Sequence, residues 1–234
     1  MILPAIVAFV LSVMACRLGA ADDYWIPRGS PETEAGKMKT LEMVEPRTYI
    51  SQAQMPYTIT NSGSYYVITP LVGLPSSNGI TINASHVRLD LCGFALVGTP
   101  GSLSGIIAPS WCDNISIRNG VVANWGEFGI NATNVKDAAF ADVKVFGNSY
   151  GGMYAGDNAL LERCSAYNNG TTAPITDPPL DDGIRAGSFS TLIGCKARFN
   201  RGAGIHTFFH SRITECTATE SRQADGIHAE DYCM

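Results

Sequence analysis

Glycine followed by a large apolar residue recurs along the chain at nearly even intervals. The pairs are Gly79-Ile80, Gly105-Ile106, Gly129-Ile130, Gly152-Met153, Gly183-Ile184, Gly204-Ile205 and Gly226-Ile227. Successive glycines are 26, 24, 23, 31, 21 and 22 residues apart. Such a period is typical of a solenoid, in which each repeat stacks on its neighbours. Because a helical crossover does not fit in so short a repeat, the pattern predicts an all-β chain wound into a parallel β-helix, right-handed by the usual rule for crossovers.

Apolar and polar residues also alternate in register within the repeats. Residues 139–148 align with residues 160–169, and the same pattern continues at 195–200 and 216–221. Since the side chains of a strand alternate between its two faces, one aligned column should point inward: Val145, Ala166, Ala197 and Ala218. A second column should lie at a corner, where asparagine tolerates left-handed backbone and stacks its amides: Asn148, Asn169, Asn200 and Ser221. The apolar residues that follow the repeat glycines should form one buried column.

The first 21 residues are predicted to be an export signal. Residues 2–14 are nearly all apolar, and the small residues Gly19, Ala20 and Ala21 follow. This run is too short to span a membrane, and no second apolar segment follows it. Residues 13–16 also resemble a lipobox, in which Cys16 would carry a lipid anchor. We therefore expect a secreted, periplasmic or cell-surface protein without a transmembrane segment.

The rest of the chain divides into three parts. Residues 22–45 are expected to form a tether and a short helix, which Ser30, Pro31 and Glu32 would begin. Residues 46–78 hold two strand-like stretches that predict a hairpin or a first irregular turn, acting as the N-terminal cap of the stack. Residues 79–234 carry the β-helix repeats. The last repeat opens at Gly226, close to Met234, so we expect it to be incomplete and completed by a further C-terminal part or a partner.

The net charge and the positions of the cysteines indicate which partners and which cysteine states to expect. The net charge of −5 argues against nucleic-acid binding, which requires a basic stripe. Cys164, Cys195 and Cys216 each lie 12 residues after their repeat glycine and so share one column. Three cysteines in one column leave at least one without a partner there, so free buried thiols are favoured over a disulfide framework. The cysteines show no CxxC motif that would indicate a structural metal site.

Candidate site residues follow from the same periodicity. The residue two places after each glycine should point outward, and these positions hold Thr81, Ile107, Asn131, Tyr154, Arg185, His206 and His228. Asp182 and Asp225 precede the glycines of two of these repeats. We therefore expect Asp182, Arg185, His206, Asp225 and His228 to be the catalytic candidates. Asn131 and Tyr154 are the substrate-binding candidates.

These side chains suit carbohydrate chemistry. Arginine can bind a sugar carboxylate through two parallel hydrogen bonds, and histidine transfers protons near neutral pH. The longest repeat contains an insertion with Asp177, Asp181 and Asp182, whose oxygens would suit one Ca²⁺ ion. The alternative is a solvated polar column without catalysis, because Asp-Gly is also favoured turn chemistry.

Several segments resemble a known family. Residues 38–41, 45–48, 63–66 and 87–94 are similar to the opening segment of exported bacterial right-handed β-helix repeat proteins, within the pectate-lyase-like superfold. The resemblance covers roughly residues 38–234 and implies the same fold. That superfold contains lyases, hydrolases, epimerases, tailspikes and adhesins, so fold alone does not select an activity. The resemblance implies a protein that binds or processes a polysaccharide on one outer face, as a lyase, hydrolase or epimerase. The alternative is a non-catalytic cell-surface or structural solenoid.

Overall fold

The computed structural model describes residues 46–171 and 181–234. These residues belong to one compact unit, residues 41–234. The expected export signal, Cys16, the tether with its short helix, and Asp177 lie outside the described residues. Within the described ranges the only helix is a short 3-10 helix, η3 (Gln52–Gln54), and no helix there is long and apolar enough to cross a membrane.

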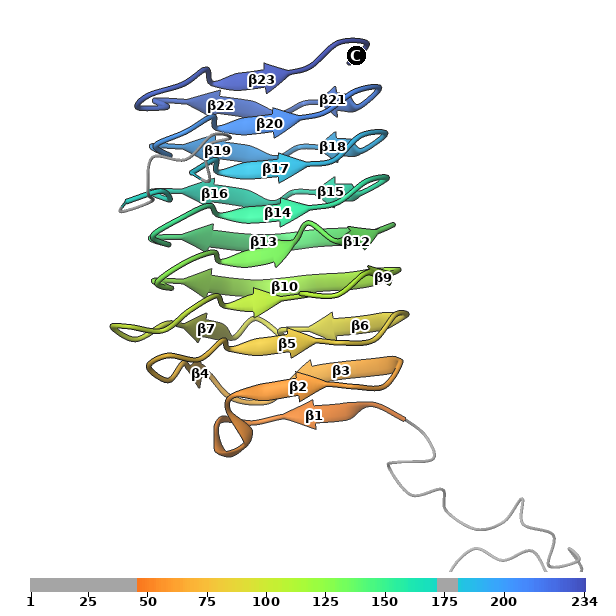
Figure 1. Ribbon diagram of the computed structural model, residues 1–234, viewed down its shortest axis with the longest axis vertical. Helices are drawn as coiled ribbons and strands as arrows, with labels where there is room; N and C mark the ends of the chain where they lie inside the picture. The colour runs from red at the N-terminus through yellow and green to blue at the C-terminus, as the bar shows by residue number, and fades with distance from the viewer. Residues whose placement is uncertain (1–45, 172–180) are drawn as a thin grey trace, which may run out of the picture. The chain divides into compact units, whose positions relative to one another are not determined.

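Short strands stack one above another from β1 to β23 (Figure 1). The eight-stranded sheet consists of β2 (Tyr57–Ile59), β5 (Ile80–Ile82), β8 (Ile106–Ile107), β11 (Ile130–Ala132), β14 (Met153–Ala155), β17 (Ile184–Ala186), β20 (Ile205–Thr207) and β23 (Ile227–Ala229). The main path of the thirteen-stranded sheet consists of β1 (Thr48–Ile50), β3 (Gly63–Val67), β6 (Val87–Asp90), β10 (Ile115–Ala123), β13 (Ala139–Phe146), β15 (Leu160–Glu162), β18 (Thr191–Ile193) and β21 (Arg212–Thr214). Its other strands are β4 (Leu71–Val72), β7 (Ala95–Val97), β16 (Ser165–Tyr167), β19 (Lys196–Arg198) and β22 (Thr217–Thr219). A third, two-stranded sheet pairs β9 (Cys112–Asp113) with β12 (Val135–Lys136).

The pairings confirm a parallel β-helix. Each repeat is one coil of the stack, and its strands pair in parallel with the corresponding strands of the neighbouring coils. The first strands follow the same rule, because β2 pairs with β5 and β3 pairs with β1 and β6. Of the two arrangements expected for residues 46–78, the structure therefore selects the solenoid turn, and the hairpin does not form.

The repeat glycines lie where successive coils approach most closely. A Cβ atom placed on Gly183 would lie 2.7 Å from the carbonyl oxygen of Gly204 in the next coil. The same conflict, at 2.3–2.7 Å, recurs from each repeat glycine to the next, from Gly79 to Gly204. Real Cβ atoms do not approach an oxygen this closely, so the stacking requires glycine at these positions. Close approach of the backbone therefore explains the spacing of the sequence pattern.

The apolar residues after these glycines form the expected buried column, with one exception. Six of them are fully buried: Ile80, Ile106, Ile130, Met153, Ile184 and Ile205. Ile227 is 40% exposed, which contradicts the expectation for that position. Its strand, β23, pairs with β20 on one side only among the described residues. A coil stacked on both sides is therefore what buries this column.

The asparagine column is confirmed as an amide ladder, but its expected backbone geometry is wrong. The Nδ2 atom of Asn148 donates to Oδ1 of Asn169, and Nδ2 of Asn169 donates to Oδ1 of Asn200, both at 2.9 Å. All three side chains are buried, and none of the three residues has the expected left-handed backbone. The left-handed residues are the ones just before them, including Asn168 and Phe199. The corner is therefore turned one residue earlier, and the amides satisfy one another inside the coil.

The cysteines of the described residues are free thiols. Cys164 and Cys195 are fully buried, as expected for an inward column, and Cys216 is partly covered. Hydrogen bonding to Cys164 raises the pKa of the Cys195 thiol to about 12, so this thiol stays protonated at neutral pH. Cys92, by contrast, is exposed. The thiols of the column therefore act as small core side chains.

Candidate functional site

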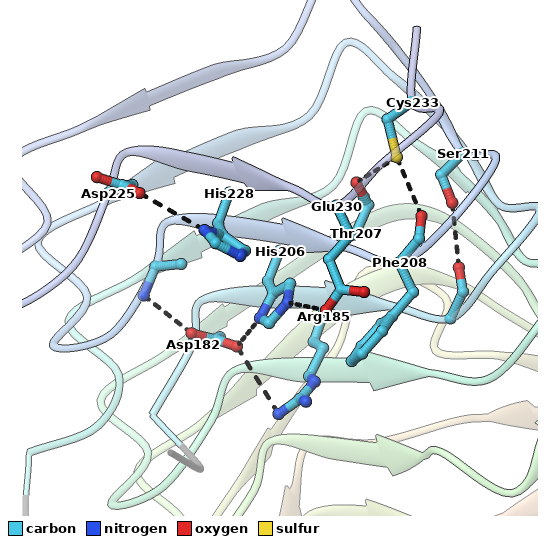
Figure 2. A network of polar contacts seen from close by, with 12 residues as sticks. Asp182, Arg185, His206, Thr207, Phe208, Ser211, Asp225, His228, Glu230 and Cys233 are labelled. Carbon is cyan, nitrogen blue, oxygen red and sulfur yellow. Dashed lines mark hydrogen bonds and ion pairs between the residues drawn. The ribbon is translucent and has the colours of Figure 1, made fainter. Parts of the chain in front are cut away.

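Four polar and aromatic side chains lie side by side on the outer face of the eight-stranded sheet. Tyr154, Arg185, His206 and His228 are paired in register on β14, β17, β20 and β23. This register is the one that the repeat glycines predict, and the longest repeat does not disturb it. Figure 2 shows Arg185, His206 and His228 projecting from the same side of successive coils.

Asp182 holds this cluster together from a buried position just before β17. Its Oδ2 atom lies 3.0 Å from Nδ1 of His206 and 4.0 Å from a guanidinium nitrogen of Arg185. Its Oδ1 atom accepts a hydrogen bond from the backbone N–H of Ala203 at 2.9 Å. Both carboxylate oxygens are therefore occupied by groups from its own coil and from the next (Figure 2).

Arg185 is held between two aromatic rings. Its guanidinium carbon lies 5.6 Å from the ring centre of Tyr154 and 5.0 Å from that of Phe208. The hydroxyl of Tyr154 accepts a hydrogen bond from the backbone N–H of Asp182 at 3.2 Å. Burial, followed by the charge of Asp182, raises the pKa of Tyr154, so the phenol stays neutral. The cation is therefore placed by cation–π contacts and by a nearby carboxylate.

A pocket of about 200 Å³ opens beside Arg185. It is lined by Thr133, Tyr154, Ala155, Gly156, Asp157, Arg185, Gly187, Ser188 and Phe208. Gly156 and Gly187 lie two residues after Tyr154 and Arg185, on neighbouring coils. A Cβ atom on Gly156 would lie 2.3 Å from the carbonyl oxygen of Val135, and one on Gly187 would lie 2.6 Å from the carbonyl carbon of Gly156, so both glycines allow neighbouring coils to approach closely at the pocket wall. The pocket therefore combines a partly buried cation with aromatic walls.

A second group of side chains gathers above Asp182. One donor atom each of His206, His228 and Glu230 lies within 4.8 Å of the others. The Nε2 atom of His206 is 3.8 Å from Oε1 of Glu230, and this nitrogen is buried without a hydrogen-bond partner among the described residues. The carboxylate of Asp225 lies 3.5 Å from Nδ1 of His228. All of these residues are visible around β20 and β23 in Figure 2.

The structure brings most of the expected site residues together. Asp182, Arg185 and His206 are in contact, and His228 joins them through a ring-to-ring contact with His206 at 4.8 Å. Arg185 and His206 are only 13% and 16% exposed, whereas His228 is 48% exposed, so solvent reaches this column mainly at its His228 end. Asn131 is in the same ladder but two strands away from Arg185, where its Oδ1 accepts from Thr133.

Sequence reasoning missed Phe208 and Glu230. Each lies two residues after a histidine of the outer column, and strand alternation gives such residues the same face. The same offset finds Gly156 and Gly187, which line the pocket where neighbouring coils approach closely. Extending the outward pattern by one more position would therefore have found three residues that line the pocket and the acidic member of the histidine cluster.

The expected calcium ligands that are described contact other groups of the protein, although Oδ1 of Asp181 is buried without a hydrogen-bond partner among the described residues. Asp182 is engaged by His206, and Oδ2 of Asp181 lies 3.6 Å from Nε of Arg201. Burial, and then the neighbouring charge of Asp182, raise the pKa of Asp181. The third expected ligand, Asp177, lies outside the described residues. A calcium site at this insertion stays a prediction.

The comparison with protein families agrees with the observed architecture. Residues 76–234 match the family model described as a right-handed β-helix region. Among solved structures, the chain is similar to the crystal structure of pectate lyase Pel9A, with 12% identity and a TM-score of 0.44. The alignment covers 76% of this chain and 64% of the pectate lyase chain. A search of curated proteins returned no match.

Proposed function

For this chain, which belongs to the right-handed β-helix family, we propose that it binds an acidic polysaccharide in the pocket beside Arg185. The observation that carries the proposal is the guanidinium of Arg185, held between Tyr154 and Phe208 at the wall of this pocket. Apolar walls with a few converging polar groups are typical of ligand sites. A planar guanidinium fixed by its surroundings matches the two oxygens of a carboxylate.

A polymer suits this position better than a small free ligand. The pocket lies in a ladder that continues across several coils, with Asn131 on one side and His206 on the other. An extended chain lying along the ladder would contact outward residues of several coils at once. The apolar residues 2–14 support export, which would give the protein access to a polysaccharide outside the cytoplasm.

The pairing of Asp182 with His206 favours a second candidate, catalysis of proton transfer. A carboxylate on Nδ1 fixes the imidazole so that Nε2 can accept a proton. Removal of the proton next to a uronate carboxyl group is the first step of both elimination and epimerisation. Arg185, on the adjacent strand, would bind that carboxylate while His206 takes the proton. In this structure Nε2 is covered, so the step requires Glu230 or His228 to move aside.

A groove on the thirteen-stranded sheet provides a matched comparison. This groove, of about 420 Å³, also combines cations with an aromatic ring and is lined in part by Lys144, Tyr167, Lys196 and Arg198. Arg198 is already bound to Glu220 at 2.8 Å. Lys196→Ala therefore removes a cation from this groove and leaves the Arg185 pocket unchanged.

The test is a panel of uronate-containing and neutral oligosaccharides titrated into the purified chain by calorimetry. We expect binding of uronate ligands that Arg185→Lys weakens about tenfold or more, because lysine lacks the planar fork, while Lys196→Ala binds normally. The reverse result, loss of uronate binding in Lys196→Ala alone, would place the ligand on the thirteen-stranded sheet and contradict binding in the Arg185 pocket. Absence of binding to every glycan would favour the structural solenoid.

The same panel tests catalysis. Elimination produces an unsaturated uronate, whose ultraviolet absorbance can be followed continuously. Absorbance that grows with wild-type protein and not with His206→Ala would support the proton-transfer candidate. Binding without turnover would leave the protein as a polysaccharide-binding module.

A further inference from the structure

We propose that His206, His228 and Glu230 bind one divalent transition-metal ion, with Asp182 orienting His206 for it. Two imidazoles and one carboxylate converge here from adjacent coils. His206 and His228 are paired directly on β20 and β23, and Glu230 follows β23 immediately. The site is distinct from the pocket beside Arg185, because none of the three residues lines that pocket.

The separations fit a common ion after small side-chain rotations. Zinc binds histidine nitrogen and carboxylate oxygen at about 2.0–2.2 Å, so tetrahedral ligand atoms lie about 3.4 Å apart. Nε2 of His206 and Oε1 of Glu230 are already 3.8 Å apart, and all three donors lie within 4.8 Å of one another. The side chains of His228 and Glu230 are partly exposed, so they can rotate to bring their ligand atoms to the separation that zinc requires.

The hydrogen bonding around His206 leaves its Nε2 atom available to bind an ion. Asp182 contacts Nδ1 at 3.0 Å, which directs the proton to that nitrogen and the lone pair of Nε2 toward Glu230 and His228. A carboxylate behind a ligating histidine is a common outer partner in metal sites. Nε2 is buried without a hydrogen-bond partner among the described residues, and such atoms are costly to leave unsatisfied. A bound ion would satisfy it.

His228 also has a carboxylate near its Nδ1 atom, although this carboxylate comes from its own coil. The carboxylate of Asp225 lies 3.5 Å from Nδ1 of His228. Asp225 and Asp182 occupy equivalent places in their repeats, one residue before the glycine. Together with Glu230, these acids supply negative charge around the two imidazoles, which offsets the nearby guanidinium of Arg185.

The ligand types select the class of ion. Imidazole nitrogen suits zinc, copper, nickel and iron, whereas calcium and magnesium prefer shells made of oxygen. Three protein ligands leave a coordination position for water or for an oxygen of a ligand. The structure therefore points to a zinc-type ion at this place.

The test uses Zn²⁺ alone and the complete chain, first stripped with a chelator. Calorimetry should show one high-affinity equivalent, and the thermal midpoint should rise with free Zn²⁺ because an ion that binds only the folded state stabilises it. His228→Ala should remove this equivalent. Glu230→Gln should weaken binding, and Asp182→Asn should lower affinity by about 10–100-fold through the orientation of His206.

Two variants serve as controls. His86→Ala removes an exposed histidine of another part of the stack and should bind Zn²⁺ as wild type does. Cys233→Ser tests the thiol near Thr207, because thiolates also bind zinc (Figure 2). Circular dichroism checks folding. His228 and Glu230 are the more exposed ligands, so their variants test metal binding even if His206→Ala does not fold.

Two results would overturn the proposal. One is a folded wild-type chain with no stoichiometric Zn²⁺ binding, and the other is binding that persists unchanged in both His228→Ala and Glu230→Gln. Since no glycan is present, neither outcome depends on the polysaccharide proposal. If both proposals hold, added Zn²⁺ should block proton transfer by His206, because the ion takes the Nε2 lone pair, while glycan binding at Arg185 persists.

Discussion

The carboxylate of Asp182 lies 3.0 Å from the imidazole of His206, although 24 residues separate them in the chain. The stacking of one coil on the next produces this contact, because Asp182 precedes β17 and His206 lies in the middle of β20. The same carboxylate also binds the backbone of Ala203, so it connects two coils as well as orienting the imidazole.

Asp182→Asn is therefore expected to destabilise the fold. The Asp182 side chain is 3% exposed, and the loss of charged hydrogen bonds in such a place costs about 1.5–3 kcal/mol. Chemical denaturation of wild type and variant measures the difference. Asp225→Asn is the matched control, since Asp225 is 77% exposed and its substitution should change stability by less than about 0.5 kcal/mol. Equal effects of the two substitutions would contradict the structural role of Asp182.

Gly183→Ala should destabilise the stack strongly. Its Cβ would lie 2.3 Å from Nδ2 of Asn200 and 2.7 Å from the carbonyl oxygen of Gly204. Insertion of a methyl group into a packed interior costs about 1–3 kcal/mol. Gly226→Ala places the same methyl group in the same ladder, but its nearest neighbour there is 3.0 Å away. Thermal unfolding should show a clearly larger loss for Gly183→Ala, and a larger loss for Gly226→Ala would exclude close approach as the reason for these glycines.

Ile184→Asp should be far more damaging than Ile227→Asp. Both residues belong to the apolar column after the repeat glycines, yet Ile184 is fully buried and Ile227 is 40% exposed. A buried, unpaired carboxylate costs several kcal/mol or shifts its own protonation to avoid ionisation. We expect Ile184→Asp to reduce the yield of folded protein or abolish it, and Ile227→Asp to fold, as judged by circular dichroism and size exclusion. Comparable behaviour of the two variants would contradict the burial difference.

The raised pKa of Asp181 predicts a specific dependence of stability on pH. Burial makes the folded state hold this proton more tightly than the unfolded chain, whose carboxyl has the ordinary value of 3.8. The contribution of Asp181 to stability is therefore fully present below that value and is lost as pH rises through the raised folded value. Asp181→Asn removes this loss, so the stability of the variant relative to wild type should increase as pH rises from about 4 to 7.

Denaturant unfolding of both proteins across that pH range tests this prediction. The change with pH is the quantity to compare, because the substitution also alters packing and hydrogen bonding by an amount that does not depend on pH, whereas the attraction of Arg201 is already included in the net raised pKa of Asp181. A stability difference that does not vary with pH, or that moves in the opposite direction, would contradict the raised pKa.

The sequence by itself determined the fold and the axis of the site. Gly183 and Gly204 mark where neighbouring coils touch. Because only glycine fits at these contacts, the distance between successive contacts appears in the sequence as the spacing of the glycines. Once the glycines set the register, alternation places Arg185, His206 and His228 in one outward ladder. The inward direction of Ile184 follows from the same alternation. These features are local and periodic, so they can be inferred from the sequence without the tertiary structure.

Only the tertiary structure decided which of these residues meet and how deeply they lie. The contact of Asp182 with His206 and the position of Phe208 against Arg185 depend on side-chain directions across coils. The burial of Asn169 within an amide ladder depends in the same way on the asparagines above and below it. The exposure of Ile227 depends on how many coils cover it. A repeat pattern predicts which residues each coil places on its inner and outer faces. Burial, hydrogen bonding and the convergence of His206, His228 and Glu230 arise only between coils, where residues far apart in sequence are brought into contact.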